Sequence, residues 1–483
     1  MLDNELENVQ KTTFDQDEIN KQLQDICIQL KSIPNIGVNY LEYISALIYV
    51  LYENRIDFEH ILTQNNNIKF ILDFIENSLE KIRENENRLF INIRFKDNIR
   101  EENYDAFKQI ILNLFDLILD LEKYDNSKHI LAKSYEYIIL KAVQAGYTSL
   151  NNEEYYTPKG VVKTMVKLAN IQDKAAIYNP ASGSGNFFVE SARTAQIFAF
   201  GEEPNISNFN ICNTNLWLHD IKDKRINSEY GEYGEGSKMF DVAIGNPPFS
   251  SDTLEISALP PTSSSYTKFL VMMFNSINEN GKVEIILPHG FLFKKSRAEY
   301  YLRKELVNNR YIDAIIGLPD KLFYDTKIPV IILSINKAKR NNEILFIDAS
   351  KEYTSKRRTN ILAINNQDKI VNTYNNRTEI DGFSRLVNIE EIVGNDFDLS
   401  IKRYITANNE VKSIDVDEIE NKIRNLDLER KEIQEQIANI IHKNKPNTYW
   451  STNMCLVFLW CQRSSYLQLF GSHNDWYKYQ SIY

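Results

Sequence analysis

The segment "AAIYNPASGSGNF" (residues 175–187) runs from a short apolar stretch into a glycine-rich turn and then into a helical pattern. A glycine turn between a strand and a helix lets backbone N–H groups approach a ligand closely. The dinucleotide-binding pattern Gly-x-Gly-x-x-Gly is incomplete, because Phe188 occupies the third glycine position. By itself the turn indicates a strand–turn–helix unit, which is either a ligand site or only a tight connection.

An acidic pair follows this turn at the distance expected for a cofactor site. The apolar run "IFAF" (197–200) precedes Gly201, Glu202 and Glu203. A carboxylate at the end of the second strand of such a sheet can bind both hydroxyl groups of a ribose. The two glutamates could equally be a solvated pair, but position favours Glu203. The turn and Glu203 together predict a site for an adenosine-containing cofactor.

Short apolar runs alternate with helical patterns from about residue 170 onward. Helix candidates are "NFFVESARTAQIFAF" (186–200) and "KKSRAEYYLRKELVNN" (294–309). Beyond the run at 175–178, apolar runs lie at residues 240–245, 281–288, 312–319, 328–336 and 343–350. Strands that alternate with helices indicate a mostly parallel sheet that is covered on both faces. The predicted fold class is therefore α/β.

The two flanking parts of the chain have a different character. The stretches at 39–53 and 104–124 repeat apolar residues with the period of an amphipathic helix, which predicts an N-terminal helical domain over residues 1–128. Near the other end, residues 416–442 repeat apolar side chains over about three heptads. This segment is either a coiled-coil arm or a single amphipathic helix packed on its own domain.

The last stretch, residues 446–483, differs again in composition. It contains three of the four tryptophans but only three charged residues. We hypothesise that this atypical tail is not native to the protein, for example the product of a frameshift. Reading the gene's other frames beyond codon 445 tests the idea, because absence of a charged, helical continuation there would rule it out.

Composition limits the class of protein. The chain has 483 residues and a formal net charge of −10, whereas a lone nucleic-acid-binding domain is usually basic. Work on nucleic acid would therefore need a local basic patch or a basic partner. Four cysteines without a CxxC pair and six histidines without zinc-type spacing favour a reducing compartment and no metal site. With no signal-peptide pattern and no run of 18 apolar residues, we expect a cytoplasmic protein without a membrane span.

The segment "FDVAIGNPPFSS" (240–251) places Asn-Pro-Pro-Phe directly after an apolar run. This is the expected carboxyl end of a strand, where open α/β sheets bind ligands. The Asn246 side-chain oxygen and the Pro247 carbonyl can accept two hydrogen bonds from one –NH2 group, and Phe249 can stack on a planar ring. Pro247 and Pro248 in succession fix this backbone. Adenine has both features, and an adenine in a duplex must flip out to reach such a pocket.

Asn-Pro-Pro-Phe downstream of a glycine turn resembles the N6-adenine DNA methyltransferases of the gamma group, which use S-adenosylmethionine. Over residues 130–445 the chain resembles the modification subunit of type I restriction-modification systems. Matching segments include "SYEYIILKAV" (134–143), "EEYYTPKGVVKTMVKLA" (153–169), "NTNLWLHDI" (213–221), "GKVEIILPHGFLF" (281–293), "IIGLPDKLFYDTKIPVIILSINK" (315–337) and "NDFDLSIKRYI" (395–405). The resemblance implies a Rossmann-like methyltransferase sheet in a catalytic domain at 129–360, followed by a C-terminal region with a long helix at 361–445.

Carried onto this sequence, the resemblance assigns roles to three groups of residues. The methionine side of the donor would be lined by Glu154, Tyr155, Tyr156, Thr157, Pro158 and Lys159. The glycine turn would be Gly183, Ser184, Gly185 and Asn186, and Glu203 would hold the ribose. The target adenine would be gripped by Asn246, Pro247, Pro248 and Phe249. In this family the amine attacks the sulfonium methyl group directly, so catalysis relies on positioning and on polarisation of the amine.

Two positions depart from the family pattern. Asn179 stands where the family usually has aspartate, and a hydrogen bond to a charged group contributes about 1.5–3 kcal/mol. The usual Gly-Asp, whose acidic residue contacts the cofactor's adenine, is replaced in residues 225–240, where Asn227 is the expected substitute. An inactive copy that acts only in assembly is therefore a second hypothesis. A methyltransferase for a protein glutamine or for RNA is a third, since such enzymes also use an Asn-Pro-Pro-aromatic box.

The resemblance also implies partners. In type I systems a specificity subunit reads the DNA sequence and the modification subunits supply the catalysis. We expect this chain to act on DNA with a specificity subunit, in two copies per complex, with or without a restriction subunit. An acidic chain without an evident sequence-reading module fits this division of labour, because the partner would bring base contacts and positive charge.

Overall fold

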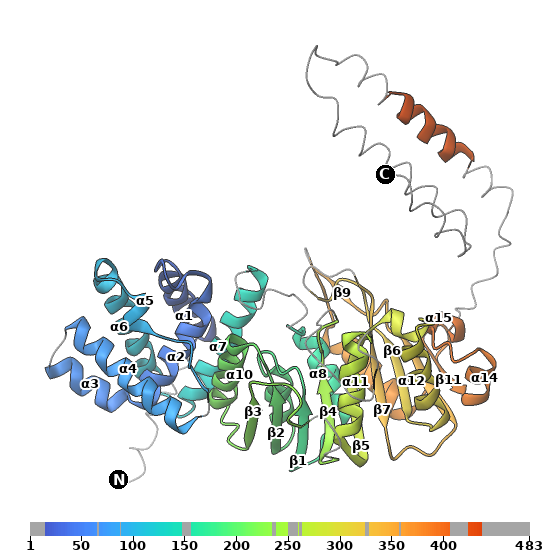
Figure 1. The fold of residues 1–483 in the computed structure, drawn as a ribbon, viewed down its shortest axis with the longest axis horizontal. Helices are drawn as coiled ribbons and strands as arrows, with labels where there is room; N and C mark the ends of the chain where they lie inside the picture. The colour runs from blue at the N-terminus through green and yellow to red at the C-terminus, as the bar shows by residue number, and fades with distance from the viewer. Residues whose placement is uncertain are drawn as a thin grey trace, which may run out of the picture. The chain divides into compact units, whose positions relative to one another are not determined.

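The computed structural model describes residues 15–405 and 424–436, apart from 65–66, 87, 147–155, 234–237, 250–258, 260–262, 324–327 and 357–358. The chain divides into two compact units, Met1–Asn408 and Asn409–Tyr483. The first unit combines helices with a nine-stranded sheet (Figure 1). Within the described part of the chain, no helix is long and apolar enough to cross a membrane.

The N-terminal part of the first unit is helical, and the helices predicted at 39–53 and 104–124 are confirmed. The helices are α1 (Gln16–Lys31), α2 (Tyr40–Glu53), α3 (Arg55–Gln64), α4 (Ile68–Asn85), α5 (Phe95–Asn98), α6 (Tyr104–Leu121) and α7 (Ser127–Gln144). They share one hydrophobic cluster, in which Ile44 and Tyr135 are fully buried. The same cluster includes Leu218 of α10 (Ile206–Leu218), so these helices pack directly on the α/β layer, beside β3 (Figure 1).

The sheet has the strand order β11-β8-β6-β7-β5-β4-β1-β2-β3. Its strands are β1 (Ala175–Asn179), β2 (Ile197–Glu202), β3 (Lys224–Asn227), β4 (Phe240–Gly245), β5 (Ile277–Pro288), β6 (Ile312–Gly317), β7 (Val330–Asn336), β8 (Glu343–Asp348) and β11 (Ser384–Asn388). Neighbours from β3 to β5 are parallel, as are β6 and β8, whereas β7 is antiparallel to β5 and β6, and β11 to β8. The predicted mostly parallel sheet is therefore confirmed. A separate hairpin consists of β9 (Thr354–Ser355) and β10 (Asn360–Ile361).

The helix predicted at 186–200 is wrong in its second half. The helix α9 (Asn186–Ala192) is short, and residues Ile197–Glu202 form β2 instead. Because β2 lies between β1 and β3 and pairs with both, its backbone forms hydrogen bonds with a neighbouring strand on each side. This tertiary pairing overrides the local helical pattern. The other helix candidate, at 294–309, is confirmed as α12 (Arg297–Asn308).

Helices cover both faces of the sheet. Along β4, Val242 and Ile244 belong to one hydrophobic cluster and Ala243 to another, as the two-residue period of a strand requires. The first cluster includes side chains of α8 (Lys159–Ala169), α9 and α13 (Ile364–Asn376). The second includes side chains of α11 (Ser265–Ser276), α12, α14 (Ile389–Gly394) and α15 (Ile401–Tyr404). With both faces closed, the ends of the strands are the place for ligands.

The second unit contains a helix at residues 424–436, and every residue of this helix is exposed. Leu426 and Ile433, two members of the predicted apolar repeat, are 61% and 55% exposed. The rest of the segment predicted at 416–442 lies outside the described residues, as does the tail 446–483. The choice between a coiled-coil arm and a packed amphipathic helix therefore stays open, and so does the hypothesis about the tail.

Candidate functional site

The glycine turn and the Asn-Pro-Pro-Phe box are far apart along the chain but meet at the carboxyl edge of the sheet. β1 and β4 are parallel neighbours, with Ile177 opposite Val242. Their last residues are in close contact, since a Cβ atom added at Gly245 would lie 2.8 Å from Asn179 Oδ1. The glycine turn follows β1 and the Asn-Pro-Pro-Phe box follows β4. Both therefore start from one point of the edge at which open α/β sheets bind ligands.

The glycine turn is held between its own backbone geometry and the side chains of α10. Gly183 and Gly185 have φ angles of +54° and +79°, in the left-handed region that favours glycine. A Cβ atom at Gly185 would lie 3.1 Å from Cys212 Sγ on α10. The side-chain amide of Asn215, also on α10, donates to the Ser184 carbonyl at 2.8 Å. The turn is therefore fixed before any ligand binds.

Glu203 lies buried against this turn, one residue beyond β2. Its carboxylate accepts hydrogen bonds from the backbone N–H groups of Gly183 at 2.9 Å and Asn205 at 3.1 Å. Burial raises the pKa of Glu203 to about 7 despite these bonds. The Glu202 carboxylate instead accepts from the backbone N–H groups of Gly231 and Tyr233. Both glutamates are buried, so the solvated-pair interpretation is wrong, and of the two it is Glu203 that contacts the turn.

Asn179 leaves a buried donor without a partner at the base of the turn. Its side chain is fully buried, and its Oδ1 accepts from the Ala181 backbone N–H at 3.0 Å. Its Nδ2 has no hydrogen-bond partner among the described residues. Buried polar groups are nearly always paired, so an unpaired one beside a candidate site indicates a missing acceptor.

The end of β3 also borders the site. Asn227, the last residue of β3, lies opposite Glu202, and its carbonyl accepts from the Glu203 backbone N–H at 2.8 Å. Its side-chain amide donates to Glu232. Asn227 therefore lies at the edge where the residue that contacts the cofactor's adenine is expected. The contact itself stays a prediction.

The Asn-Pro-Pro-Phe box is packed into the structure. Residues 246–248 are buried and Phe249 is half-buried. The Phe249 ring meets Tyr266 edge to face, with ring centroids 6.3 Å apart and an interplanar angle of 89°. The Tyr266 hydroxyl in turn donates to Glu299 at 3.1 Å. An aromatic contact of this kind fixes the orientation of the ring, so the box has the preformed shape that recognition of a planar group requires.

The residues predicted on the methionine side of the donor are only partly described. Glu154 and Tyr155 lie outside the described residues, whereas Tyr156 and Thr157 are buried. Pro158 then leads into α8. A cavity of about 490 Å³ lies between α7, the start of α8 and the β9–β10 hairpin. Its described lining includes Tyr156, Pro158 and Lys159 but no residue of the glycine turn or of the Asn-Pro-Pro-Phe box, so it borders only the predicted methionine side of the donor site.

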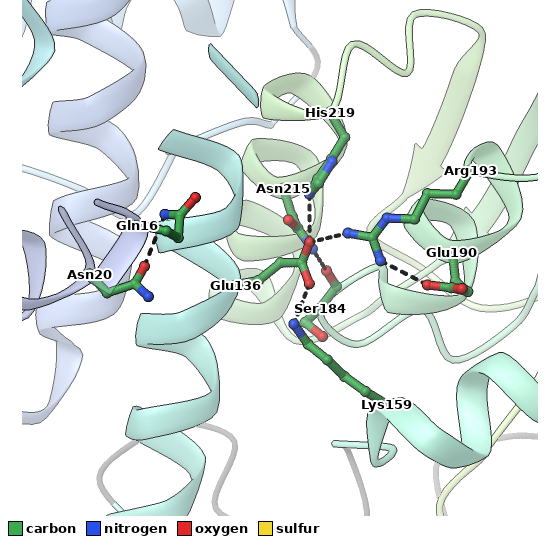
Figure 2. A network of polar contacts seen from close by, with 9 residues as sticks. All are labelled: Gln16, Asn20, Glu136, Lys159, Ser184, Glu190, Arg193, Asn215 and His219. Atoms are coloured by element: carbon green, nitrogen blue, oxygen red, sulfur yellow. Dashed lines mark hydrogen bonds and ion pairs between the residues drawn. The ribbon is translucent and has the colours of Figure 1, made fainter. Parts of the chain in front are cut away.

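A buried carboxylate joins three elements that surround the turn (Figure 2). Glu136 of α7 is 4% exposed. Its two oxygens lie 2.6 Å from Lys159 Nζ, 2.6 Å from Arg193 Nη2 and 2.9 Å from His219 Nε2. Arg193 also pairs with Glu190 at 2.7 Å. Burial by itself would raise the pKa of Glu136, but the bonds to His219, Lys159 and Arg193 hold it well below its usual range.

Sequence reasoning missed this network, which we call the Glu136 network, although two of its members lie in segments that carry the family resemblance. Glu136 lies within 134–143 and His219 within 213–221. A single sequence does not show that these side chains meet. Lys159 was predicted to line the donor, and the structure shows its ammonium group paired with Glu136. Asn186, predicted as the last residue of the glycine turn, starts α9.

Comparison with known proteins agrees with the fold and with the sequence motifs described above. The family described as N-6 DNA Methylase matches residues 126–413. This match spans more than half of the chain, and the chain belongs to this family. The predicted resemblance to type I modification subunits is also confirmed by its relatives. One is the type I restriction enzyme MjaVII methylase subunit of Methanocaldococcus jannaschii, which is 32% identical over 322 residues. The alignment covers 60% of this chain and 55% of that relative, so the chain spans about half the length of the relative.

Solved structures with the same architecture include methyltransferases. The type I restriction-modification system methyltransferase subunit from Streptococcus thermophilus superposes with a TM-score of 0.66 at 24% identity, covering 81% of this chain and 100% of that one. A putative class I S-adenosylmethionine-dependent methyltransferase from Listeria monocytogenes gives a TM-score of 0.50 at 16% identity, covering 75% and 98%. At these identities the likeness concerns the fold, and it confirms the predicted Rossmann-like methyltransferase sheet.

Proposed function

We propose that the chain transfers a methyl group from S-adenosylmethionine to the N6 atom of adenine in DNA. The observation that carries this proposal is the adjacency of the glycine turn after β1 and the Asn-Pro-Pro-Phe box after β4. The turn offers Glu203 and the unpaired amide of Asn179 to a donor. The box offers hydrogen-bond acceptors to an amine. Membership of the N-6 DNA Methylase family supports the same reaction.

In this proposal the residues of the chain act by positioning. When bound, S-adenosylmethionine supplies an electrophilic methyl group. Asn246 Oδ1 and the Pro247 carbonyl accept the two N–H groups of the target amine, which polarises the nitrogen and aims its lone pair. Phe249 stacks on the base, which has to be flipped out of the duplex. Glu203 accepts hydrogen bonds from the ribose hydroxyl groups of the donor. No covalent bond to the protein forms, so orientation and polarisation supply the acceleration.

We further propose that the chain works as a modification subunit beside a specificity subunit. A net charge of −10 disfavours a chain that holds the DNA backbone by itself. The relative from M. jannaschii is named as the methylase subunit of a type I restriction enzyme. Two copies around one specificity subunit, with or without a restriction subunit, is the arrangement that the family resemblance implies. Such a complex would act in the cytoplasm, together with the DNA.

Methylated-base sequencing of DNA from cells that express the chain tests this proposal. The chain is expressed with and without a specificity subunit taken from a neighbouring gene. We expect N6-methyladenine at one split motif, and only when both subunits are present. Absence of the mark with both subunits soluble would contradict the proposal and favour an inactive copy that acts only in assembly.

The variant Asn246→Ala separates methyl transfer from donor binding. Because the lost contact is to the target amine, methyl transfer should fall by about 100- to 1000-fold, while donor binding measured by calorimetry stays nearly unchanged. Equal loss of transfer and of donor binding would show that Asn246 belongs to the donor site instead.

A further inference from the structure

We propose that Glu136 is a positioning residue for the methyl-donor site, through which α7 of the N-terminal helices sets the geometry of the glycine turn. The inference rests on the proposed function, since it assumes that the turn binds the donor. It concerns a residue whose ion pairs are with other elements than the turn.

The three partners of Glu136 come from three different elements (Figure 2). Lys159 is the first residue of α8, Arg193 is the C-cap of α9, and His219 is the C-cap of α10. Each lies within 2.9 Å of the same buried carboxylate. Arg193 donates a hydrogen bond to this carboxylate and Lys159 forms an ion pair with it, and such contacts between ionised groups are stronger than neutral ones. One side chain of α7 therefore fixes the ends of three helices relative to one another.

Each of these helices leads directly to the candidate donor site. Residues 156–158, predicted on the methionine side of the donor, immediately precede Lys159. The helix α9 is seven residues long and starts at Asn186, where the glycine turn ends, so a shift at Arg193 moves the turn. On α10, Asn215 donates to the Ser184 carbonyl of the turn at 2.8 Å. The Glu136 network thus holds three elements that lead to the turn or contact it.

The burial of the partners determines what neutralising Glu136 would do. Its own side chain is 4% exposed and that of His219 is 6% exposed, whereas those of Arg193 and Lys159 are 36% and 48% exposed. Without the negative charge, Lys159 and Arg193 gain by moving towards water, because two cations no longer have a shared counter-charge. Such movements displace the start of α8 and the end of α9. The donor site would then lose its prepared geometry while both hydrophobic layers of the sheet remain packed.

The test is the affinity of the purified full-length chain for S-adenosylmethionine, measured by isothermal titration calorimetry without DNA. Glu136→Gln keeps the shape of the side chain and removes its charge. We expect donor affinity to fall by about tenfold, the size of a typical coupling between sites, with a melting temperature close to wild type. Glu136→Asp keeps the charge and should recover part of the loss.

Glu190→Gln is the matched control, because it removes the other carboxylate on Arg193 and leaves Glu136 in place. Its donor affinity should equal that of wild type. If Glu136→Gln fails to fold, Arg193→Gln replaces it, since Lys159 and His219 still lie beside the carboxylate of Glu136 in this variant. In assays with the specificity subunit, Glu136→Gln and Arg193→Gln should raise KM for the donor and leave kcat at saturating donor nearly unchanged, whereas Glu190→Gln should change neither.

Two outcomes overturn this proposal, and they differ from a failure of the proposed function. If wild type binds the donor and Glu136→Gln binds it equally well, Glu136 has only a structural role between helices and the inference is wrong. The same holds if Glu190→Gln loses as much affinity as Glu136→Gln. If the wild-type chain itself does not bind the donor, the assignment of the donor site fails first.

Discussion

At the scale of single residues, Asn179 marks the difference between this chain and the pattern of its family. Asn179→Asp keeps the acceptor for the Ala181 N–H and replaces the unpaired Nδ2 with a charged oxygen. We expect donor binding to tighten by about tenfold, because the carboxylate attracts the positively charged ammonium and sulfonium groups of S-adenosylmethionine, and a hydrogen bond to a charged group contributes about 1.5–3 kcal/mol. Calorimetric titration measures this change. An unchanged affinity would show that the side chain does not face the donor.

The same substitution should cost stability when no donor is present. The new carboxylate is fully buried beside Gly245, and a buried acceptor without enough partners costs about 1–3 kcal/mol. The melting temperature of Asn179→Asp should therefore fall below wild type without donor and approach it with donor. If Asn179→Asp and wild type melt at the same temperature both without and with donor, the interpretation of Nδ2 as a buried group that lacks a partner is wrong.

Glu203 predicts a pH dependence of donor binding. Its pKa is raised from 4.5 to about 7 by burial, so in the donor-free protein it contributes stability at low pH that is lost as the pH rises through about 7. Ribose hydroxyl groups donate best to the ionised form. Donor affinity should therefore rise by up to about tenfold between pH 6 and pH 8, and Glu203→Gln should bind weakly with a flat profile. A wild-type affinity that falls over this range would contradict the assigned role.

Residue identities alone predict only part of the candidate site, namely the glycine turn, Glu203 and the Asn-Pro-Pro-Phe box. Asn246, the glycine turn and Glu203 stand out in sequence because each has a chemical reason to follow a strand. The structure does place all three at the same edge of the sheet. Glu136 has no such signal, because its partners come from three helices that only the fold brings together. The roles of the site residues themselves stay predictions.

At the scale of elements, the turn between β1 and α9 should tolerate no side chain at its second glycine. Gly185 has φ of +79°, and a Cβ atom there would lie 3.1 Å from Cys212 Sγ. Gly185→Ala should lower stability by about 1–2 kcal/mol from the left-handed backbone alone, and donor affinity should fall with it. Denaturant unfolding and calorimetry measure the two effects.

Gly394→Ala is the control for this prediction. It lies in α14, and nothing comes within 4 Å of a Cβ atom added there. Alanine is preferred over glycine in helices, so this variant should be as stable as wild type or slightly more so. Equal destabilisation by both substitutions would mean that the effect comes from glycine replacement in general and not from the turn.

Elements differed in how well the sequence predicted them. The central strands β1, β4, β5, β6, β7 and β8 are apolar because helices cover both of their faces, and they were readily predicted. The edge strands β3 and β11 are partly exposed and polar, as in "KRIN" and "SRLVN", and carry no comparable pattern. β2 follows α9 after only four residues, so one apolar pattern covered both elements.

At the scale of the whole molecule, the N-terminal helices and the sheet depend on each other. Phe209, Ile211 and Leu218 of α10 are buried in the cluster that the N-terminal helices form. A fragment of residues 145–405 would expose them and would leave His219 without Glu136. We expect this fragment to aggregate in size-exclusion chromatography. A monodisperse fragment with cooperative melting near that of the full chain would contradict this dependence.

Removal of residues 409–483 is the control for the truncation. These residues form the second compact unit, so their loss should leave the melting transition of the first unit close to that of the full chain. The comparison separates loss of a packed layer from loss of chain length.

The Glu136 network also has a consequence for how genes of this kind can exchange parts. A crossover between two related genes that falls between codons 144 and 159 would combine α7 of one parent with α8, α9 and α10 of the other. The hybrid would keep a satisfied network only if both parents have compatible charges at 136, 159, 193 and 219. Crossovers ahead of α7 keep these four positions together. Crossovers between related genes should therefore be found more often before codon 127 than between codons 136 and 219.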